Sequence, residues 1–254
     1  MKKTQFLFIF FGFIFSCFGS LAIQPEKINI LVLTERGGQH ESFVKAAFQW
    51  LTHEKEKLNI EWTEINNTKP VNESYLKQFE LIIQLDFPPY TWTQDAEKAF
   101  ISYIEEGRGG WIGFHHATLL GEFDGYKMWN WFSEFMGGIR FQNYIAQLAD
   151  GTVRVEDSSH PVMRGVSGNF TLRADEWYTF NKSPRPNVHV LANVDEDSYT
   201  PQTDIKMGDH PVVWVNEQKK ARNVYFLMGH SNRLFESDDF KLMFANAINW
   251  AGNK

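Results

Sequence analysis

The sequence predicts an α/β fold with a mainly parallel central sheet and helices on its faces. In the first half of the chain, short apolar runs alternate with segments of helical periodicity. The first run, residues 27–33 (KINILVL), is almost continuously apolar, which is typical of a strand buried on both faces. Strands and helices that alternate at this spacing are joined by right-handed crossovers, so we expect neighbouring strands to be parallel.

The rest of the first half continues this alternation. Residues 41–57 place Phe43, Ala47 and Leu51 at helical spacing and predict an amphipathic helix. Further strands are predicted at residues 59–65, 79–85 and 110–114.

A second helix is predicted at residues 93–106. Thr91 or Thr93 can cap its start, and Asp95 lies in the first turn, where the helix dipole favours an anion. Gly107 can adopt the left-handed conformation that ends a helix. These signals place the helix between the third and fourth strands.

The second half of the chain is less regular. Ser237 can cap a closing helix at residues 237–250, and the polar segment 195–209 predicts a long surface loop. Strands are predicted at residues 151–156, 188–194, 211–215 and 223–228.

The first 22 residues are predicted to be a secretory signal peptide. Lys2 and Lys3 form a positive start, and residues 6–15 are almost wholly apolar. This run is too short to cross a membrane as a helix, which needs roughly 20 apolar residues. Two processing routes stay open, cleavage after Ala22 or lipidation of Cys17 in a degenerate lipobox. An uncleaved membrane anchor is a third alternative.

Processing would leave one domain of residues 23–254, either periplasmic or held in the envelope as a lipoprotein. Cleavage after Ala22 removes Lys2 and Lys3, which shifts the formal net charge from −6 to −8, and it also removes the only cysteine. An acidic protein is a poor match for nucleic acid or an anionic membrane. The only membrane contact that we expect is through a lipid on Cys17, and the sequence leaves the oligomeric state open.

Polar or ionisable side chains follow four of the predicted strands. In open parallel sheets, ligands bind outside the carboxyl ends of the strands, so we expect these side chains to line a functional cleft. They are Arg36 and His40 after the first strand, Asp86 after the third, His115 and His116 after the fourth, and His230 after the last.

Each of these residues also has a purely structural interpretation. His40 can cap the helix that begins near residue 41, and Asp86 can cap a turn. If the fourth strand continues, His115 and His116 point to opposite faces and at most one of them reaches the cleft. The coincidence of three histidine-bearing strand ends favours the functional interpretation.

Two further segments are candidates for the same site. His160 precedes a proline, which holds it extended, although it is equally a turn residue. Asp175 and Glu176 are paired carboxylates beside Trp177 and Tyr178. A carboxylate next to tryptophan can have a raised pKa and act as an acid or base, whereas the structural alternative is a turn with the tryptophan in the core.

The usual catalytic motifs G-x-S-x-G, H-E-x-x-H, the P-loop and G-x-G-x-x-G do not occur. The chain does contain an ordered set of other motifs: residues 109–117 (GGWIGFHHA), His160-Pro161 with Gly165, residues 175–178 (DEWY), residues 211–214 (PVVW) and Gly229-His230. This set resembles the ThuA-like (trehalose utilisation) family, and the resemblance extends over residues 28–252.

The resemblance implies a flavodoxin-like three-layer sandwich similar to class I glutamine amidotransferases. In those enzymes the turn after the matching strand carries a cysteine nucleophile, whereas here His115 occupies that turn. Cysteine-dependent amidotransfer is therefore excluded for the mature chain. The resemblance also implies a role in disaccharide or glycoside catabolism, linked with oxidoreductases that make 3-keto-sugars.

Two hypotheses follow for the function. The first is an enzyme, a hydrolase, lyase or isomerase, that acts on a small saccharide or keto-sugar by acid–base chemistry, with a divalent metal left open as a cofactor. The second is a non-catalytic carbohydrate-binding protein of the envelope, and a structural or partner-binding protein ranks last. The catalytic candidates are His115, His116, Glu176 and His230. The substrate-binding candidates are Arg36, His40, Asp86, His160, Asp175, Trp177 and Tyr178.

Overall fold

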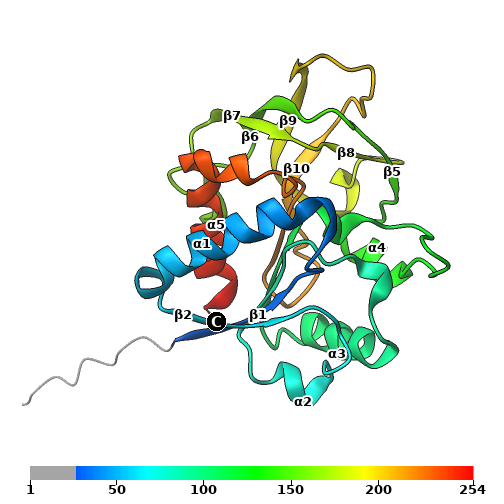
Figure 1. Ribbon diagram of the computed structural model, residues 1–254, viewed down its shortest axis with the longest axis vertical. Helices are drawn as coiled ribbons and strands as arrows, with labels where there is room; N and C mark the ends of the chain where they lie inside the picture. Colours follow the sequence, from blue (N-terminus) through cyan, green and yellow to red (C-terminus); the bar gives the residue numbers. More distant parts are fainter. Residues whose placement is uncertain (1–26, 254) are drawn as a thin grey trace, which may run out of the picture.

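The structure is a computed structural model that describes residues 27–253. Its main feature is a nine-stranded mixed sheet (Figure 1). Its strand order is β2-β1-β3-β4-β11-β10-β9-β6-β7. The predicted signal peptide, with Cys17 and Ala22, lies outside the described residues. Within residues 27–253, no helix has both the length and the apolar character needed to cross a membrane.

The first five strands in this order are parallel. They are β2 (Ile60–Ile65), β1 (Ile28–Leu33), β3 (Leu81–Gln84), β4 (Gly110–Phe114) and β11 (Asn223–Phe226). Counted along the chain, this is the 2-1-3-4-5 order of flavodoxin-like sheets. The predicted fold class is therefore confirmed, and each of these strands lies within a predicted strand.

The other half of the sheet is antiparallel, which the sequence analysis did not predict. Its strands are β10 (Pro211–Val215), β9 (His189–Thr200), β6 (Ala149–Val155) and β7 (Asn169–Asp175). The predicted loop 195–209 is wrong in its first part, because β9 continues to Thr200. Side chains of β9 are alternately buried and solvent-facing, and acidic residues occupy solvent-facing positions. This part of the sequence therefore has the composition of a loop although it forms a strand.

A separate two-stranded ribbon borders the site. It joins β5 (Phe141–Tyr144) and β8 (Tyr178–Phe180) in antiparallel register. Both strands are short and were not predicted from the sequence. The turn between β7 and β8 consists of Glu176 and Trp177, so the ribbon fixes where Glu176 stands relative to the main sheet.

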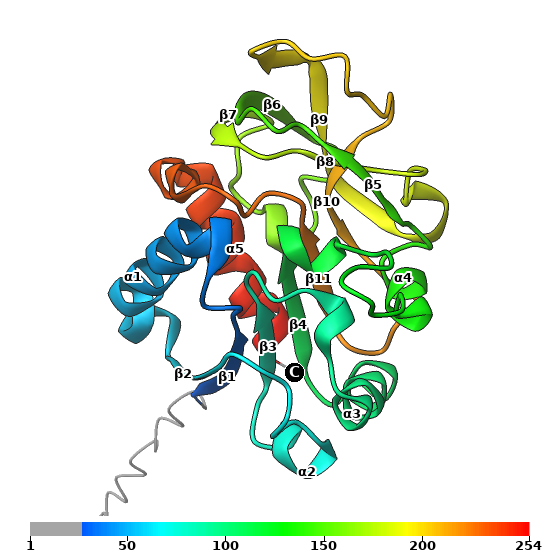
Figure 2. The ribbon, with the colours of Figure 1, turned by 45° about the vertical axis from the view of Figure 1, so that its right-hand side comes forward.

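Helices cover both faces of the parallel half (Figure 2). Phe114 of β4 contacts Phe43 and Phe244, whereas Trp111 of the same strand contacts Phe100 and Phe135. Strand residues three apart point to opposite faces, which explains the two partner sets. One face carries α1 (Glu41–Leu58) and α5 (Asp238–Gly252); the other carries α3 (Gln94–Glu105) and α4 (Asn130–Phe135), with the short α2 (Glu73–Leu76) beside α3.

The helix boundaries follow the predicted capping signals. The hydroxyl of Thr93 accepts the backbone N–H of Ala96, and the hydroxyl of Ser237 accepts that of Phe240. Gly107 ends α3 with a φ of 68°, the left-handed conformation expected there. Because β1, β3, β4 and β11 are parallel, their carboxyl ends lie at one edge of the sheet, where the candidate residues are found.

Candidate functional site

Four imidazoles and one carboxylate gather at this edge, and we call them the histidine cluster: His40, His115, His116, Glu176 and His230. The ring of His40 lies at the centre, 5.1 Å from that of His115, 4.5 Å from that of His116 and 4.8 Å from that of His230. Segments that are far apart in the sequence thus deliver their side chains to one place.

Both histidines after β4 belong to the cluster; the strand does not continue through them, so the alternative in which they point to opposite faces does not apply. The strand ends at Phe114, and a 3-10 turn, His115–Thr118, begins at once with His115 at a φ of 34°. A left-handed φ at a non-glycine residue is strained and persists only when the surroundings hold it. Here the carbonyl of His115 accepts hydrogen bonds from the hydroxyls of Thr118 and Tyr225.

Backbone carbonyls fix the orientation of two of the rings. Nδ1 of His115 lies 2.9 Å from the carbonyl oxygen of Leu227, and Nδ1 of His116 lies 2.8 Å from that of Asp86. A carbonyl only accepts, so each Nδ1 carries the proton and donates, and a neutral ring then keeps its lone pair on Nε2. Burial lowers the pKa of His116 to about 4, with a further decrease from His115.

His40 is buried without the partners that a structural histidine normally has. It stands at the start of α1 but its side chain makes no capping hydrogen bond, so the structural alternative of a capping role does not hold. Its Nε2 is buried and has no hydrogen-bond partner within the described residues. Burial and the neighbouring His115, His116 and His230 lower the pKa of His40 to about 2, so the ring is neutral at pH 7.

Glu176 supplies the negative charge of the cluster. Its Oε2 lies 3.1 Å from Nε2 of His115 and 3.5 Å from Nδ1 of His230. Burial alone would raise the pKa of Glu176, but the two histidines outweigh it and hold the pKa at about 2. For His230, burial lowers the pKa, and the carboxylates of Glu176 and Asp175 reverse this, so the pKa is raised.

Asp175 holds the loop that carries His230. Its carboxylate accepts three backbone N–H groups, from Gly229 at 3.2 Å, His230 at 3.0 Å and Ser231 at 2.9 Å. The side chain is fully buried, and burial raises its pKa against the opposing effect of His115 and the backbone donors. The predicted role in substrate binding does not fit this placement, because the oxygens of Asp175 are used inside the protein.

A pocket of about 400 Å³ opens over the cluster. Its lining includes His40, His116, Glu176 and His230 of the cluster. Three aromatic side chains also line it: Phe141 and Tyr144 of β5, and Tyr178, whose ring lies 3.9 Å from that of His115. Pockets that bind small molecules combine apolar walls with a few converging polar groups, and this one has both.

Comparison with known proteins identifies the family. A family model described as trehalose utilisation, ThuA, matches residues 29–251. The chain belongs to the ThuA family. That membership indicates a sugar-related role, and a comparison with curated proteins finds no significant match.

Solved structures agree with this family and with the fold. A ThuA-like protein from Bacteroides uniformis is 26% identical with a TM-score of 0.78, over 92% of this chain and 95% of that chain. A ThuA-like protein from Parabacteroides merdae is 14% identical with a TM-score of 0.67, over 90% of this chain and 91% of its own. A protein from Thermoplasma acidophilum, described as a subunit of GMP synthase, is 12% identical with a TM-score of 0.54, over 89% and 94% of the two chains. The similarity to the Thermoplasma acidophilum protein shows only that the two chains share the amidotransferase-like fold.

Two candidates of this ThuA-family chain lie away from the cluster. Nδ1 of His160 accepts the N–H of Val162, and the ring packs 4.7 Å from that of Trp250 in α5. The side chain of Trp177 is fully buried and its Nε1 donates to the carbonyl of Ala149. The expectation that they join the site is therefore wrong, since His160 caps a local turn and Trp177 packs in the core.

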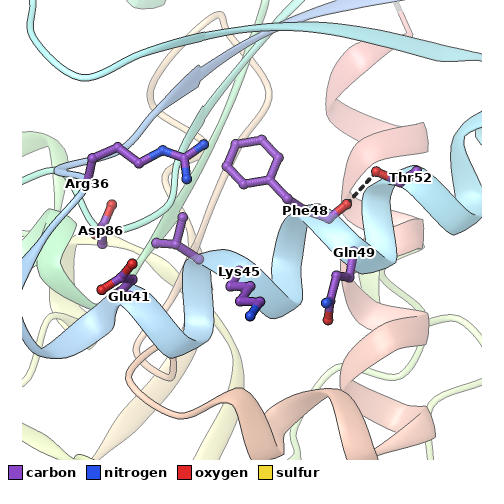
Figure 3. Close-up of a pocket in the computed structure, with 8 residues that line it drawn as sticks. Arg36, Glu41, Lys45, Phe48, Gln49, Thr52 and Asp86 are labelled. Atoms are coloured by element: carbon purple, nitrogen blue, oxygen red, sulfur yellow. Dashed lines mark hydrogen bonds between the residues drawn. The ribbon is translucent and has the colours of Figure 1, made fainter.

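Arg36 and Asp86 line a different and larger pocket of about 670 Å³ beside α1 (Figure 3). Arg36 forms an ion pair with Glu64, and its guanidinium lies 5.2 Å from the centre of the Phe48 ring. Asp86 is buried; its Oδ1 accepts the N–H of Glu35, and burial raises its pKa to about 6. The structure does not bring Arg36 to the histidine cluster. Asp86 contributes to the cluster only through its backbone carbonyl, which accepts a hydrogen bond from His116.

Glu35, Phe141 and Tyr144 line the site but were not among the predicted residues. Oε2 of Glu35 lies 3.6 Å from Nδ1 of His116, and burial together with Asp124 raises the pKa of Glu35. Glu35 precedes Arg36 in the loop after β1. The sequence therefore predicted the correct loop, but Glu35 and not Arg36 lines the site. The aromatics of β5 had no sequence signal, because that strand was not predicted.

Proposed function

We propose that the chain is an exported enzyme that acts on a sugar or keto-sugar by acid–base chemistry. The observation that carries the proposal is the pocket of about 400 Å³, which both ionisable and aromatic side chains line. Aromatic rings offer a sugar an apolar surface, while imidazoles and carboxylates offer proton transfer. The trehalose-utilisation description of the family supports the substrate class.

His116 is our candidate for the base. Its Nδ1 is held by the carbonyl of Asp86, so the lone pair of a neutral ring is on Nε2, and the residue lines the pocket. Nε2 would take the proton from a carbon next to the sugar carbonyl, and the electron pair of that C–H bond would form an enolate. His230, paired with Glu176, would stabilise the developing negative charge on oxygen.

Loss of a β-substituent would complete an elimination. The enolate electrons would re-form the carbonyl and a carbon–carbon double bond, and the leaving oxygen would depart with its bonding pair. The proton held by His116 would then neutralise the leaving oxygen, so atoms and charge balance without a redox partner.

Turnover of 3-keto-glycosides by the chain from Ile23 onward tests this proposal. We expect product formation, and a His116→Gln variant should lower kcat by about a hundredfold, the effect of losing a general base. A His53→Gln variant, altered at an exposed residue of α1, is the matched control and should keep full activity. If the saccharide binds but returns unchanged after long incubation, the chain is a carbohydrate-binding protein instead.

Export is tested by the N-terminus of the mature protein. We expect the protein isolated from the cell envelope to begin at Ile23, after cleavage between Ala22 and Ile23. Intact-mass and N-terminal peptide analysis would identify the first residue. A lipid-modified Cys17 at the N-terminus would replace this route by the lipoprotein route. An unprocessed Met1 in the cytoplasmic fraction would contradict export.

A further inference from the structure

We propose that His40, His115, His230 and Glu176 bind one divalent transition-metal ion, with Zn²⁺ as the best match. One ligand atom from each lies within 4.8 Å of the others. Imidazole suits zinc and its first-row neighbours, and three nitrogens with one carboxylate oxygen form a common type of donor set. This inference deepens the proposed function, on which it rests only for what the ion does to a substrate.

The spacing of the donor atoms fits coordination. Two ligands bound tetrahedrally at about 2.0–2.1 Å from zinc stand about 3.3–3.4 Å apart. The distances from Oε2 of Glu176 are 3.1 Å to Nε2 of His115 and 3.5 Å to Nδ1 of His230, on either side of that value. The fourth donor, from His40, comes from the ring at the centre of the cluster.

The contacts of His115 leave one ring nitrogen available to an ion. Nδ1 donates to the carbonyl of Leu227, so Nε2, which lies 3.1 Å from Oε2 of Glu176, is the nitrogen that an ion between the two residues would contact. A backbone carbonyl that fixes the tautomer of a metal-binding histidine is the usual supporting interaction at such sites.

Two buried nitrogens in the same group lack partners. Nε2 of His40 and Nδ1 of His230 are both buried without a hydrogen bond inside residues 27–253. Buried polar atoms are nearly always satisfied, so such an atom needs an explanation. Coordination to one ion would satisfy both, together with the Glu176 carboxylate.

The proposed ion would be within reach of a substrate. His40, Glu176 and His230 line the pocket, whereas His115 lies beneath it, fully buried. A sugar oxygen that enters the pocket would meet the ion from the open side. The four protein donors already complete a tetrahedral shell, so the sugar oxygen would have to bind as a fifth ligand; the ion would then polarise this carbonyl or hydroxyl oxygen next to the base His116.

Metal content is the decisive measurement. The chain from Ile23 onward, purified without a histidine tag, is analysed by elemental mass spectrometry, and about one zinc per chain is expected. Glu176→Gln and His230→Ala should each lower the content at least tenfold, whereas His160→Ala and His53→Ala should leave it unchanged. His116→Ala separates the proposed ligand set from the neighbouring group of Glu35, His40 and His116. Loss of metal in that variant with retention in His230→Ala would overturn the assignment.

A titration keeps the proposal testable if a variant does not fold. Metal-stripped parent protein is titrated with Co²⁺, and ligand-field absorption should saturate at one equivalent and disappear when Zn²⁺ is added. Absence of saturable binding for both ions would overturn the site. Bound metal without turnover of any 3-keto-glycoside would support the site and count against the proposed enzyme. Full turnover after metal removal would support the enzyme and exclude a role for the ion.

Discussion

Glu176→Gln is expected to lower kcat/KM for the sugar substrate by at least a hundredfold. Glu176 contacts both His115 and His230, so the change removes the charge that holds two imidazoles in place and that raises the pKa of His230. Loss of one acid–base or charge-stabilising partner typically costs a factor of about 10²–10⁴, and a hundredfold corresponds to about 2.7 kcal/mol of transition-state stabilisation. Steady-state kinetics on the 3-keto-glycoside that the parent turns over would measure the loss.

Replacing Glu176 by glutamine removes the negative charge of the side chain but keeps its shape. Glutamine is nearly isosteric with glutamate, so the pocket keeps its volume and its aromatic wall. Glu217→Gln is the matched control, because Glu217 is an exposed carboxylate whose histidine partner, His189, lies outside the cluster. Activity of Glu176→Gln within threefold of the parent would show that the pair of histidines does not need its carboxylate for the reaction.

The sequence predicted the convergence of the cluster for a reason that lies in the sheet. The carboxyl ends of parallel strands share an edge, so His40, His115, His116 and His230 meet once the strands are recognised. The parallel half was recognisable because its strands are buried on both faces and read as continuous apolar runs. The convergence of these four histidines does not involve the antiparallel half of the sheet, whose strands were predicted less accurately.

The errors at the site have local physical causes. Arg36 has a φ of 54°, and a left-handed residue in a strand-end loop decides which side chain turns into the cleft. No periodic pattern encodes that choice, so Glu35 was overlooked. His160 and Trp177 were grouped with the site because they stand beside proline or carboxylates. Their roles, a turn cap and a core side chain, depend on tertiary contacts with Trp250 and Ala149.

Asp175→Ala is expected to destabilise the fold by about 3 kcal/mol. The substitution leaves three backbone N–H groups, those of Gly229, His230 and Ser231, without their acceptor. Two of these residues are buried, and an unsatisfied buried donor costs about 1–3 kcal/mol. For a domain of this size each kcal/mol lowers Tm by about 2–4 °C, so a thermal scan should show a decrease of about 6–12 °C.

The control for this prediction is Asp239→Ala. Asp239 also accepts a backbone N–H, from Ser167 at 2.8 Å, but it does so at an exposed position with a single donor. Water can replace that acceptor, so the loss should stay within about 1 kcal/mol. If Asp239→Ala and Asp175→Ala lower Tm equally, burial of the three donors is not what makes Asp175 important.

The same variant connects stability with chemistry, because the three donors belong to the loop that positions His230. Asp175→Asn keeps one oxygen that can accept, while its amide group faces the remaining donors, so its stability should lie between those of the parent and Asp175→Ala. Activity measured well below each variant's Tm should follow the same order. An Asp175→Asn protein as stable as the parent but inactive would show instead that the carboxylate charge acts directly on the site, where it contributes to the raised pKa of His230.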